Sequence, residues 1–412
     1  MSGLKYGWML DLSVLQYYNH KMKKIATFLL ASIAMQSLGA QSFIQAYQDR
    51  ANMVTQTNIT TYLQEFANLG VKKTGTAANN NALEWLKTKY LSYGYTANQI
   101  AEDPFTAGSY NSKNLVITKT GTVYPNKYVI ICGHFDSITG LGVNDNGSGT
   151  SIILEAARIL KDVPTEYSIK FIHFSGEEQG LLGSTHYANT VAYQGNNRVL
   201  DIKLVFNLDQ VGGVMGNNNN TVYCDQDLGG LTSNNAASAV VTQELRNCTA
   251  LYSPLLTAVD PAEDTDYIPF EQKGEVITGF FERIRSTYPH TVNDTFANTD
   301  PVYIYNIGKA SVGALQHFAV ATGTLGTHEA VLKNTLETVK IYPNPVKDII
   351  NIELPDSGIK NFTFEVTDFQ GRSIFKRTNE TKINASGLEN GAYLGILKAG
   401  DQTVVRKVMI ER

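Results

Sequence analysis

Histidine and acidic side chains recur in five short segments of this sequence. These residue types bind metal ions and transfer protons, so the segments are the first place to look for chemistry. Each segment alone has an ordinary structural explanation, because Asn, Asp, Gly and Ser form turns and helix caps, and paired acids suit a helix start. Taken together they favour a functional site. The segments are Gly133–Ser137, Asn144–Gly149, Ser175–Gly180, Asn207–Asp209 and Tyr288–Asp294.

Together these segments supply two histidines, His134 and His290, and carboxylates that include Asp145, Glu178 and Asp209. Nitrogen and oxygen donors without cysteine suit zinc in a hydrolytic site. Two imidazoles are too few for two separate sites, but one histidine per ion and a shared carboxylate would satisfy a pair about 3.5 Å apart. The sequence therefore predicts a centre of two zinc ions.

The segment Ser175–Gly180 contains two consecutive acids, Glu177 and Glu178. A solvated helix start would explain such a pair, since the helix dipole favours negative charge there. In a hydrolytic site, one carboxylate can bind metal while its neighbour accepts and returns protons. We expect Glu177 and Glu178 to divide these tasks.

The elements that must position these residues follow an α/β pattern over residues 41–325. Short β-branched runs alternate with helix-like segments, such as Thr150–Leu160 and Leu181–Thr190, which predicts a mostly parallel mixed sheet flanked by helices on both faces. Ligand sites of such sheets form at the carboxyl ends of the strands, where the five segments fall. The predicted buried strands are Asn114–Thr118, Tyr128–Cys132, Ser168–Phe174, Lys203–Leu208 and Val276–Phe281.

Composition excludes several classes of protein. With 43% hydrophobic and 17% charged residues, the chain is neither disordered nor a membrane bundle. The formal net charge of -4 is small for 412 residues, and no basic stripe occurs. Nothing in the sequence points to nucleic acid or to an anionic membrane surface as a partner.

The first 40 residues have the pattern of a leader. Met22, Lys23 and Lys24 precede the apolar run Ile25–Met35, and the small residues at 37–40 suit cleavage before Gln41. We interpret residues 1–40 as an over-extended start over residues 1–21, with an unstructured tail as the alternative for that segment, followed by a secretory signal peptide. The apolar run is too short to favour a permanent membrane span.

Three cysteines cannot all pair in an exported chain. Cys132 lies in an apolar run and is expected to be a buried thiol. Cys224 and Cys248 could form a bridge, but sequence spacing alone does not establish the geometry that a disulfide requires. Their pairing stays open.

The quoted motifs resemble those of the co-catalytic di-zinc aminopeptidases, of the bacterial leucyl aminopeptidase type in metallopeptidase clan MH, over most of residues 60–322. The resemblance implies a peptidase domain over residues 41–325 that removes N-terminal residues from peptides, using a zinc-activated water and a glutamate base. It also implies a cis peptide bond after Asp145. By the resemblance, His134 binds one zinc, His290 binds the other, Asp145 bridges them, Glu178 and Asp209 complete the sites, Glu177 is the general base, and Asp136 accepts a hydrogen bond from His134.

Parts of the expected substrate pocket depart from the family pattern. In Thr265–Phe270, Tyr267 stands where the family commonly has a histidine, and the cysteine pair that some members carry nearby is absent. Phe281, Ile284 and Tyr288 could line an apolar pocket, although aromatic residues at such spacings often belong to the core. A preference for apolar N-terminal residues is the resulting expectation.

The composition changes after Gly326, and residues 341–412 contain short alternating segments typical of a small antiparallel β-sandwich. Residues 326–340 are expected to form a linker. The motifs Ile341–Pro345, Gly371-Arg372 and Gly391–Tyr393 resemble the C-terminal sorting domain of type IX secretion cargo. This resemblance implies a secreted or cell-surface protein and a secretion machinery as partner; a carbohydrate-binding sandwich is the alternative.

Other functions remain compatible with the same fold. Glutaminyl cyclases and carboxypeptidases share the architecture, and a surface binding protein could retain it without catalysis. The retention of Glu177, Glu178 and a complete second donor set favours an aminopeptidase over a one-zinc cyclase. An inactive relative would be expected to have lost some of these donors.

Overall fold

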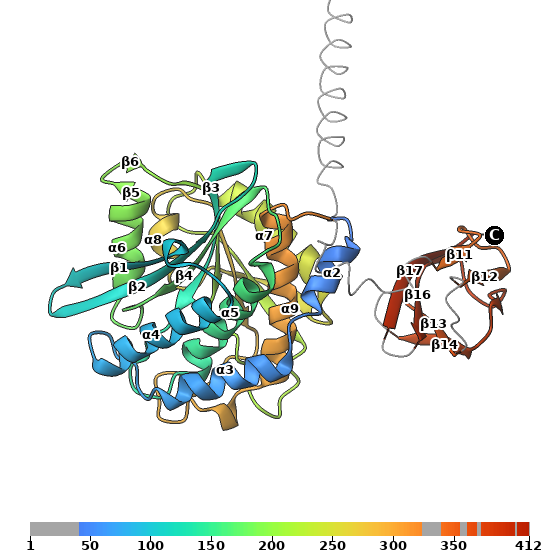
Figure 1. Cartoon of the computed structure of the whole chain (residues 1–412), viewed down its shortest axis with the longest axis horizontal. Helices are drawn as coiled ribbons and strands as arrows, with labels where there is room; N and C mark the ends of the chain where they lie inside the picture. Colours follow the sequence, from blue (N-terminus) through green and yellow to red (C-terminus); the bar gives the residue numbers. More distant parts are fainter. Residues whose placement is uncertain (1–40, 324–338, 355–360, 369–371, 400–401, 412) are drawn as a thin grey trace, which may run out of the picture. The chain divides into compact units, whose positions relative to one another are not determined.

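The computed structural model describes residues 41–323, 339–354, 361–368, 372–399 and 402–411 (Figure 1). The chain divides into two compact units, the first ending at residue 324 and the second beginning at residue 325. The signal peptide predicted within residues 1–40 lies outside the described residues, as does most of the predicted linker. No helix in the described part of the chain is long and apolar enough to cross a membrane.

A mixed eight-stranded sheet forms the centre of the first unit, with the strand order β1-β2-β4-β3-β7-β10-β8-β9. Its four central strands, β4, β3, β7 and β10, are parallel to one another. The predicted mixed sheet is therefore confirmed. In chain order the strands are β1 (Ile100–Ala107), β2 (Tyr110–Lys119), β3 (Tyr124–His134), β4 (Tyr167–Phe174), β7 (Asp201–Leu208), β8 (Thr221–Gln226), β9 (Leu256–Pro261) and β10 (Ile277–Glu282).

The five predicted strands are all present, and Asn114–Thr118 is the one among them that pairs antiparallel with both of its neighbours. This segment lies in β2, which pairs antiparallel with β4. The strands β1, β8 and β9 were not predicted. β1 and β9 lie at the two ends of the strand order and are partly exposed. Edge strands of this kind carry polar residues, so the continuous apolar run that reveals a buried strand is missing.

Both faces of the sheet are buried, and β3 shows how. Val129 and Ile131 belong to the main core, while the alternate residues Ile130 and Cys132 belong to a second core that also contains Tyr187. Successive side chains of a strand point to opposite faces. A strand that is covered on both faces therefore reads as an uninterrupted apolar run, which is what made β3 recognisable.

Helices cover the two faces (Figure 1). The predicted helix Thr150–Leu160 is α5, which contacts β3, α3, α4 and α9 and is buried on nearly every side. The predicted helix Leu181–Thr190 is only partly right, because α6 ends at His186 and the wider π-helical turn Tyr187–Ala192 follows it. The helices are α2 (Gln45–Ala51), α3 (Gln56–Asn68), α4 (Ala77–Ser92), α5 (Gly149–Leu160), α6 (Leu182–His186), α7 (Asn235–Tyr252), α8 (Ile268–Glu271) and α9 (Pro301–Phe318).

The second unit contains two antiparallel sheets around a core of its own. Phe364, Val366, Leu397 and Val408 belong to this core. One sheet has the order β11-β12-β15 and the other β14-β13-β16-β17. The strands are β11 (Lys340–Tyr342), β12 (Ile349–Glu353), β13 (Thr363–Thr367), β14 (Ser373–Thr378), β15 (Lys382–Asn384), β16 (Gly391–Ala399) and β17 (Gln402–Ile410).

The three cysteines are all buried and free. Cys224 lies in β8 and Cys248 in α7, and both side chains belong to the main core. The bridge that the sequence left open between them is not formed. All three side chains therefore act as small apolar core residues.

Candidate metal centre

The candidate site lies at the carboxyl ends of the four central parallel strands. Because these ends meet at one edge of the sheet, residues far apart in the chain converge there. His134 ends β3, Glu177 and Glu178 follow β4, Asp209 follows β7, and His290 lies in the loop after β10.

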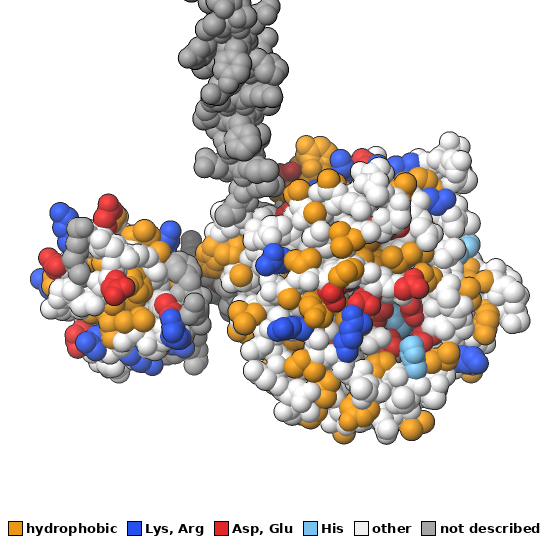
Figure 2. All heavy atoms as spheres, turned by 180° about the vertical axis from the view of Figure 1, so that it is seen from behind, with side chains coloured by type: hydrophobic (Ala, Val, Ile, Leu, Met, Phe, Trp, Pro, Cys, Tyr) orange, Lys and Arg blue, Asp and Glu red, His pale blue; other side chains and the backbone are white. Residues whose placement is uncertain are grey.

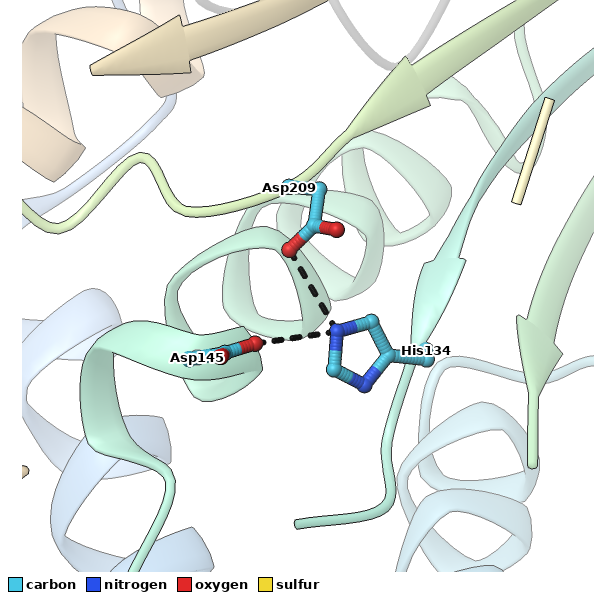
Figure 3. Close-up of side chains that lie close together, drawn as sticks. All are labelled: His134, Asp145 and Asp209. Carbon is cyan, nitrogen blue, oxygen red and sulfur yellow. Dashed lines mark ion pairs between the residues drawn. The ribbon is translucent and has the colours of Figure 1, made fainter. Parts of the chain in front are cut away.

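His134 and two carboxylates form the first group of donors (Figure 3). His134 Nε2 lies 3.1 Å from Asp145 Oδ1 and 3.3 Å from Asp209 Oδ1. Among the described residues, neither His134 Nε2 nor Asp209 Oδ1 has a hydrogen-bond partner, although both atoms are buried. A buried imidazole nitrogen and carboxylate oxygen without partners are costly unless a cation lies between them. The geometry of this group fits a metal ion.

His290 and two carboxylates form the second group. His290 Nε2 lies 3.1 Å from Asp145 Oδ2 and 2.9 Å from Glu178 Oε2. The three ligand atoms are close enough together to hold a second metal ion. Asp145 contributes one oxygen to each group, which is the arrangement of a bridging carboxylate.

The backbone around Asp145 is held close to the end of β7. The peptide bond between Asp145 and Asn146 is cis, as the family resemblance implied. Asn146 Nδ2 donates to Leu208 O at 2.8 Å. A Cβ atom on Gly149 would lie 2.4 Å from the same carbonyl oxygen, so only glycine allows the chain to approach β7 this closely.

Asp136 contacts His134, as the family resemblance implied, and it also orients the acidic pair. His134 Nδ1 lies 3.2 Å from the main-chain oxygen of Asp136 but 3.6 Å from its carboxylate, so the imidazole hydrogen bond goes to the backbone. The carboxylate instead accepts the backbone N–H groups of Glu177 and Glu178, each at 3.3 Å, and the hydroxyl of Thr74 at 3.2 Å. Asp136 therefore orients the acidic pair.

The other oxygen of Asp209 is held by Thr265. Thr265 Oγ1 donates a hydrogen bond of 2.5 Å to Asp209 Oδ2 and accepts one from Asn207 Nδ2 at 3.3 Å. This contact turns Asp209 Oδ1 toward His134. Partners that orient metal-binding side chains in this way are common around metal sites.

Asp294 was not predicted as a site residue, although it ends one of the five segments. Its carboxylate accepts the backbone N–H of Asn144 at 2.7 Å and that of Asp145 at 3.0 Å. Glu282, the last residue of β10, accepts two hydrogen bonds from the Asn144 side chain. In the sequence, only the spacing of four residues between His290 and Asp294 could have suggested that Asp294 belongs to the site. This spacing says nothing about what the carboxylate contacts.

Replacing Asp294 with asparagine should weaken metal binding. Asparagine offers one acceptor oxygen, so one of the two N–H groups would lose its partner and Asp145 would no longer be held. We expect zinc affinity to fall about 10- to 100-fold. Zinc content after dialysis against a graded chelator measures this, with Asp162→Asn as the matched control because the Asp162 side chain is 86% exposed. Equal zinc retention by the two variants would contradict the expectation.

The charges of the centre favour a bound cation. Burial raises the pKa of Glu177 well above its ordinary value, and burial together with the Asp145 carboxylate raises the pKa of Glu178 to about 8. The hydrogen bond to Asp145 raises the pKa of His290 to about 9. Burial lowers the pKa of His134, but the surrounding carboxylates outweigh this and raise it. Without metal the cluster therefore retains protons, which metal ions would displace.

Zinc binding should weaken as the pH falls. Glu178, with a pKa of about 8, and His290, with a pKa of about 9, each carry a proton at neutral pH that a zinc ion must displace. Each displaced proton lowers the apparent affinity about tenfold per pH unit below the pKa of its group. Zinc titration against a competing chelator between about pH 6 and pH 9, corrected for protonation of the chelator, measures this dependence. A constant affinity over the range would disprove it.

A cavity of about 410 Å³ opens beside the donor groups, and Asp145, Glu177, Asp209 and His290 contribute to its lining. In Figure 2, acidic side chains in red gather around histidine in pale blue on this face of the first unit. Of the three residues predicted to form an apolar pocket, Phe281 lines the cavity. The structure does not place Ile284 or Tyr288 in the lining.

Comparisons with known proteins agree with this arrangement. Residues 114–314 match Peptidase family M28, and residues 340–411 match the Secretion system C-terminal sorting domain. Aminopeptidase YwaD of Bacillus subtilis (strain 168) is 44% identical over 103 residues, which cover 24% of this chain and 22% of that protein. The matched segments thus span less than a quarter of the length of the first curated relatives.

Solved structures show the same fold. The LapA aminopeptidase of Legionella pneumophila aligns with a TM-score of 0.58 at 20% identity, over 68% of this chain and 75% of that one. The glutaminyl cyclase of Porphyromonas gingivalis aligns with a TM-score of 0.52 at 18% identity, over 64% of this chain and 98% of that one. At such identities the likeness concerns the fold alone.

Every residue of the two donor groups lies within the segment that matches the peptidase family. The C-terminal match indicates export to the cell surface or beyond. Residues 114–314, which contain the candidate site, are thus similar to Peptidase family M28, and residues 340–411 match the Secretion system C-terminal sorting domain.

Proposed function

We propose that this chain is an exported zinc aminopeptidase that removes residues from the N-termini of peptides. The observation that carries the proposal is the pair of donor groups that share Asp145, with Glu177 beside them. The match to Peptidase family M28 and the curated relatives described as aminopeptidases support it. The sorting domain supports export through a secretion machinery.

Two zinc ions fit the donor groups. One would be held by His134, Asp145 and Asp209, and the other by Asp145, Glu178 and His290. His134 Nε2 is buried and has no hydrogen-bond partner among the described residues, which supports this assignment. When bound, such ions act as Lewis acids that polarise the scissile carbonyl and make the attacking water more acidic.

Glu177 is the general base in this proposal. Its carboxylate lines the cavity and lies 3.9 Å from His134 Nε2. The Asp136 carboxylate accepts the backbone N–H of Glu177, which fixes the main chain from which the Glu177 side chain extends. Burial raises its pKa, which strengthens it as a proton acceptor once the donor groups are neutralised. The carboxylate takes a proton from the attacking water and returns it to the leaving amine.

In this proposal the acidic lining of the cavity selects substrates with a free N-terminus. An α-amine that enters beside Asp145, Glu177 and Asp209 is attracted by carboxylates, while an acetylated terminus offers no charge and more bulk. The glutaminyl cyclase of similar fold shows that the architecture alone does not decide the reaction. Two complete donor groups sharing one carboxylate favour peptide hydrolysis by a metal pair.

Hydrolysis of leucine p-nitroanilide by the full chain loaded with zinc tests the proposal. Its N-acetylated counterpart and a peptide with N-terminal glutamine are assayed beside it. Release of chromophore from the free-amine substrate alone supports an aminopeptidase. Cyclisation of the glutamine peptide without hydrolysis would identify a cyclase, and the absence of every reaction in a zinc-loaded protein would favour a binding role.

A further inference from the structure

The cavity beside the donor groups is also lined by charged side chains that the proposed chemistry does not use. Glu263 and Asp264 come from the segment between β9 and α8, and Arg285 comes from the loop after β10. These residues share the cavity with Glu177. A side chain next to the scissile bond would meet them.

Arg285 shows what this part of the cavity can hold. Its guanidinium lies 4.7 Å from the centroid of the Phe281 ring. It forms an ion pair with Glu263 and another with Asp260, whose Oδ2 lies 3.4 Å from Nη2. A cation above an aromatic face and against carboxylates is the arrangement by which proteins recognise lysine and arginine side chains. The cavity wall thus already accommodates a cationic group supplied by the chain itself.

Glu263 is held in place from the interior. Tyr267, which is fully buried, accepts the backbone N–H of Glu263 through its hydroxyl at 2.6 Å. The same hydroxyl donates to Asp225 Oδ2 at 3.1 Å. Tyr267 stands where the sequence led us to expect a histidine. Its hydroxyl fixes the backbone of Glu263 at the start of the acidic segment, so the fold itself sets the position of Glu263 in the cavity lining.

This side of the cavity, the wall formed by Glu263, Asp264 and Arg285, has more carboxylates than guanidinium groups once Asp260, which pairs with Arg285, is included. Asp260 and Glu263 both form ion pairs with Arg285. These two carboxylates already more than neutralise the single positive charge of Arg285, so the charge of Asp264 is not compensated by it. Asp264 is exposed and pairs with no basic side chain in the part of the chain that the structure describes. The wall therefore carries excess negative charge, which raises the local concentration of cationic groups.

The apolar surface available to a substrate is small. Phe281 is only 6% exposed, and its ring face is covered by Arg285. Ile284 and Tyr288, which the sequence suggested as further apolar contacts, do not line the cavity. An aliphatic side chain would therefore bury little area here.

We propose that this wall selects peptides whose N-terminal residue is cationic, and that Glu263, Asp264 and Arg285 determine this specificity. The inference rests on the proposed aminopeptidase activity. Lysine and arginine substrates are cleaved in preference to leucine substrates, and glutamate substrates are cleaved least. Exposed charge pairs contribute modestly, so we expect kcat/KM for lysine to exceed that for leucine by about three- to tenfold.

Aminoacyl p-nitroanilides of lysine, arginine, leucine and glutamate, assayed with the full zinc-loaded chain, test the inference. Raising the salt concentration should reduce the lysine-to-glutamate ratio, because salt screens exposed charges. Equal cleavage of all four substrates would overturn the specificity and leave the aminopeptidase intact. If none is cleaved, the proposed function itself fails.

Two variants separate charge selection from a structural effect. The double variant Glu263→Gln and Asp264→Asn should lower the lysine-to-glutamate ratio about five- to tenfold, since two charges are removed. Arg285→Ala removes the resident cation, so the same ratio should rise. Asp162→Asn is the control, because it removes an exposed carboxylate that does not line the cavity. A loss of activity that is equal for all substrates in both wall variants would overturn the proposal.

Discussion

Replacing Glu177 with glutamine should reduce kcat for leucine p-nitroanilide about 10²- to 10⁴-fold, the usual contribution of a general base. Glutamine has nearly the same shape, but it cannot accept a proton from the attacking water. Glu177 belongs to neither donor group, so zinc content should stay unchanged. KM should change little, because the lost interaction is made in the transition state.

Zinc analysis and a control variant are needed to interpret a loss of activity in the Glu177→Gln variant. Zinc analysis of the variant distinguishes a lost base from a lost metal site, and Glu84→Gln serves as control because the Glu84 side chain is 62% exposed. Retained activity with a full zinc complement would remove Glu177 from the reaction. Loss of zinc together with activity would show instead that Glu177 binds metal.

Replacing Asp145 with asparagine should have the other large effect. Asp145 supplies one oxygen to each donor group, so one substitution weakens both. Lewis-acid assistance is worth several kcal/mol, and each 1.36 kcal/mol is a factor of ten, so we expect activity to fall by about 10³-fold or more. Zinc bound per chain, measured by elemental analysis, should fall below that of the unaltered protein.

Asp162→Asn again provides the matched control for this change. Circular dichroism of the Asp145→Asn variant is needed beside the zinc analysis, because Asp145 lies in a buried loop. A folded variant that retains two zinc ions and full activity would show that the shared carboxylate is not required. If the variant keeps one ion per chain, the two groups differ in their dependence on Asp145.

The carboxylates around the donor groups explain why the loops at this edge of the sheet are held so closely. Asp136 accepts the backbone N–H groups of Glu177 and Glu178, and Asp294 accepts those of Asn144 and Asp145. A carboxylate that accepts backbone N–H groups fixes the main chain from which the functional side chain extends. The cost is a concentration of negative charge, which bound cations would offset.

Much of this could be predicted from the sequence because the signals are local. A strand covered on both faces must be a continuous apolar run, so the central strands could be identified without the structure. Polar residues directly after such strands had to lie at one edge of the sheet. His134, Asp145, Glu178, Asp209 and His290 were named on these grounds together with the family resemblance, and the structure brings their side chains within reach of one another.

Only the tertiary structure could decide contacts between side chains that are distant in the sequence. The resemblance implied that Asp136 accepts a hydrogen bond from His134, and its main-chain oxygen lies 3.2 Å from His134 Nδ1. The sequence did not reveal that the Asp136 carboxylate accepts the backbone N–H groups of Glu177 and Glu178, which lie 41 and 42 residues further along the chain. The same limit applied to Asp294 and Arg285: their types were visible, but their partners lie about 150 and 22 residues away, respectively, along the chain. Residue type and period determine which elements form and which side chains share an edge. The packing of loops against one another determines what each carboxylate holds, and no local pattern encodes it.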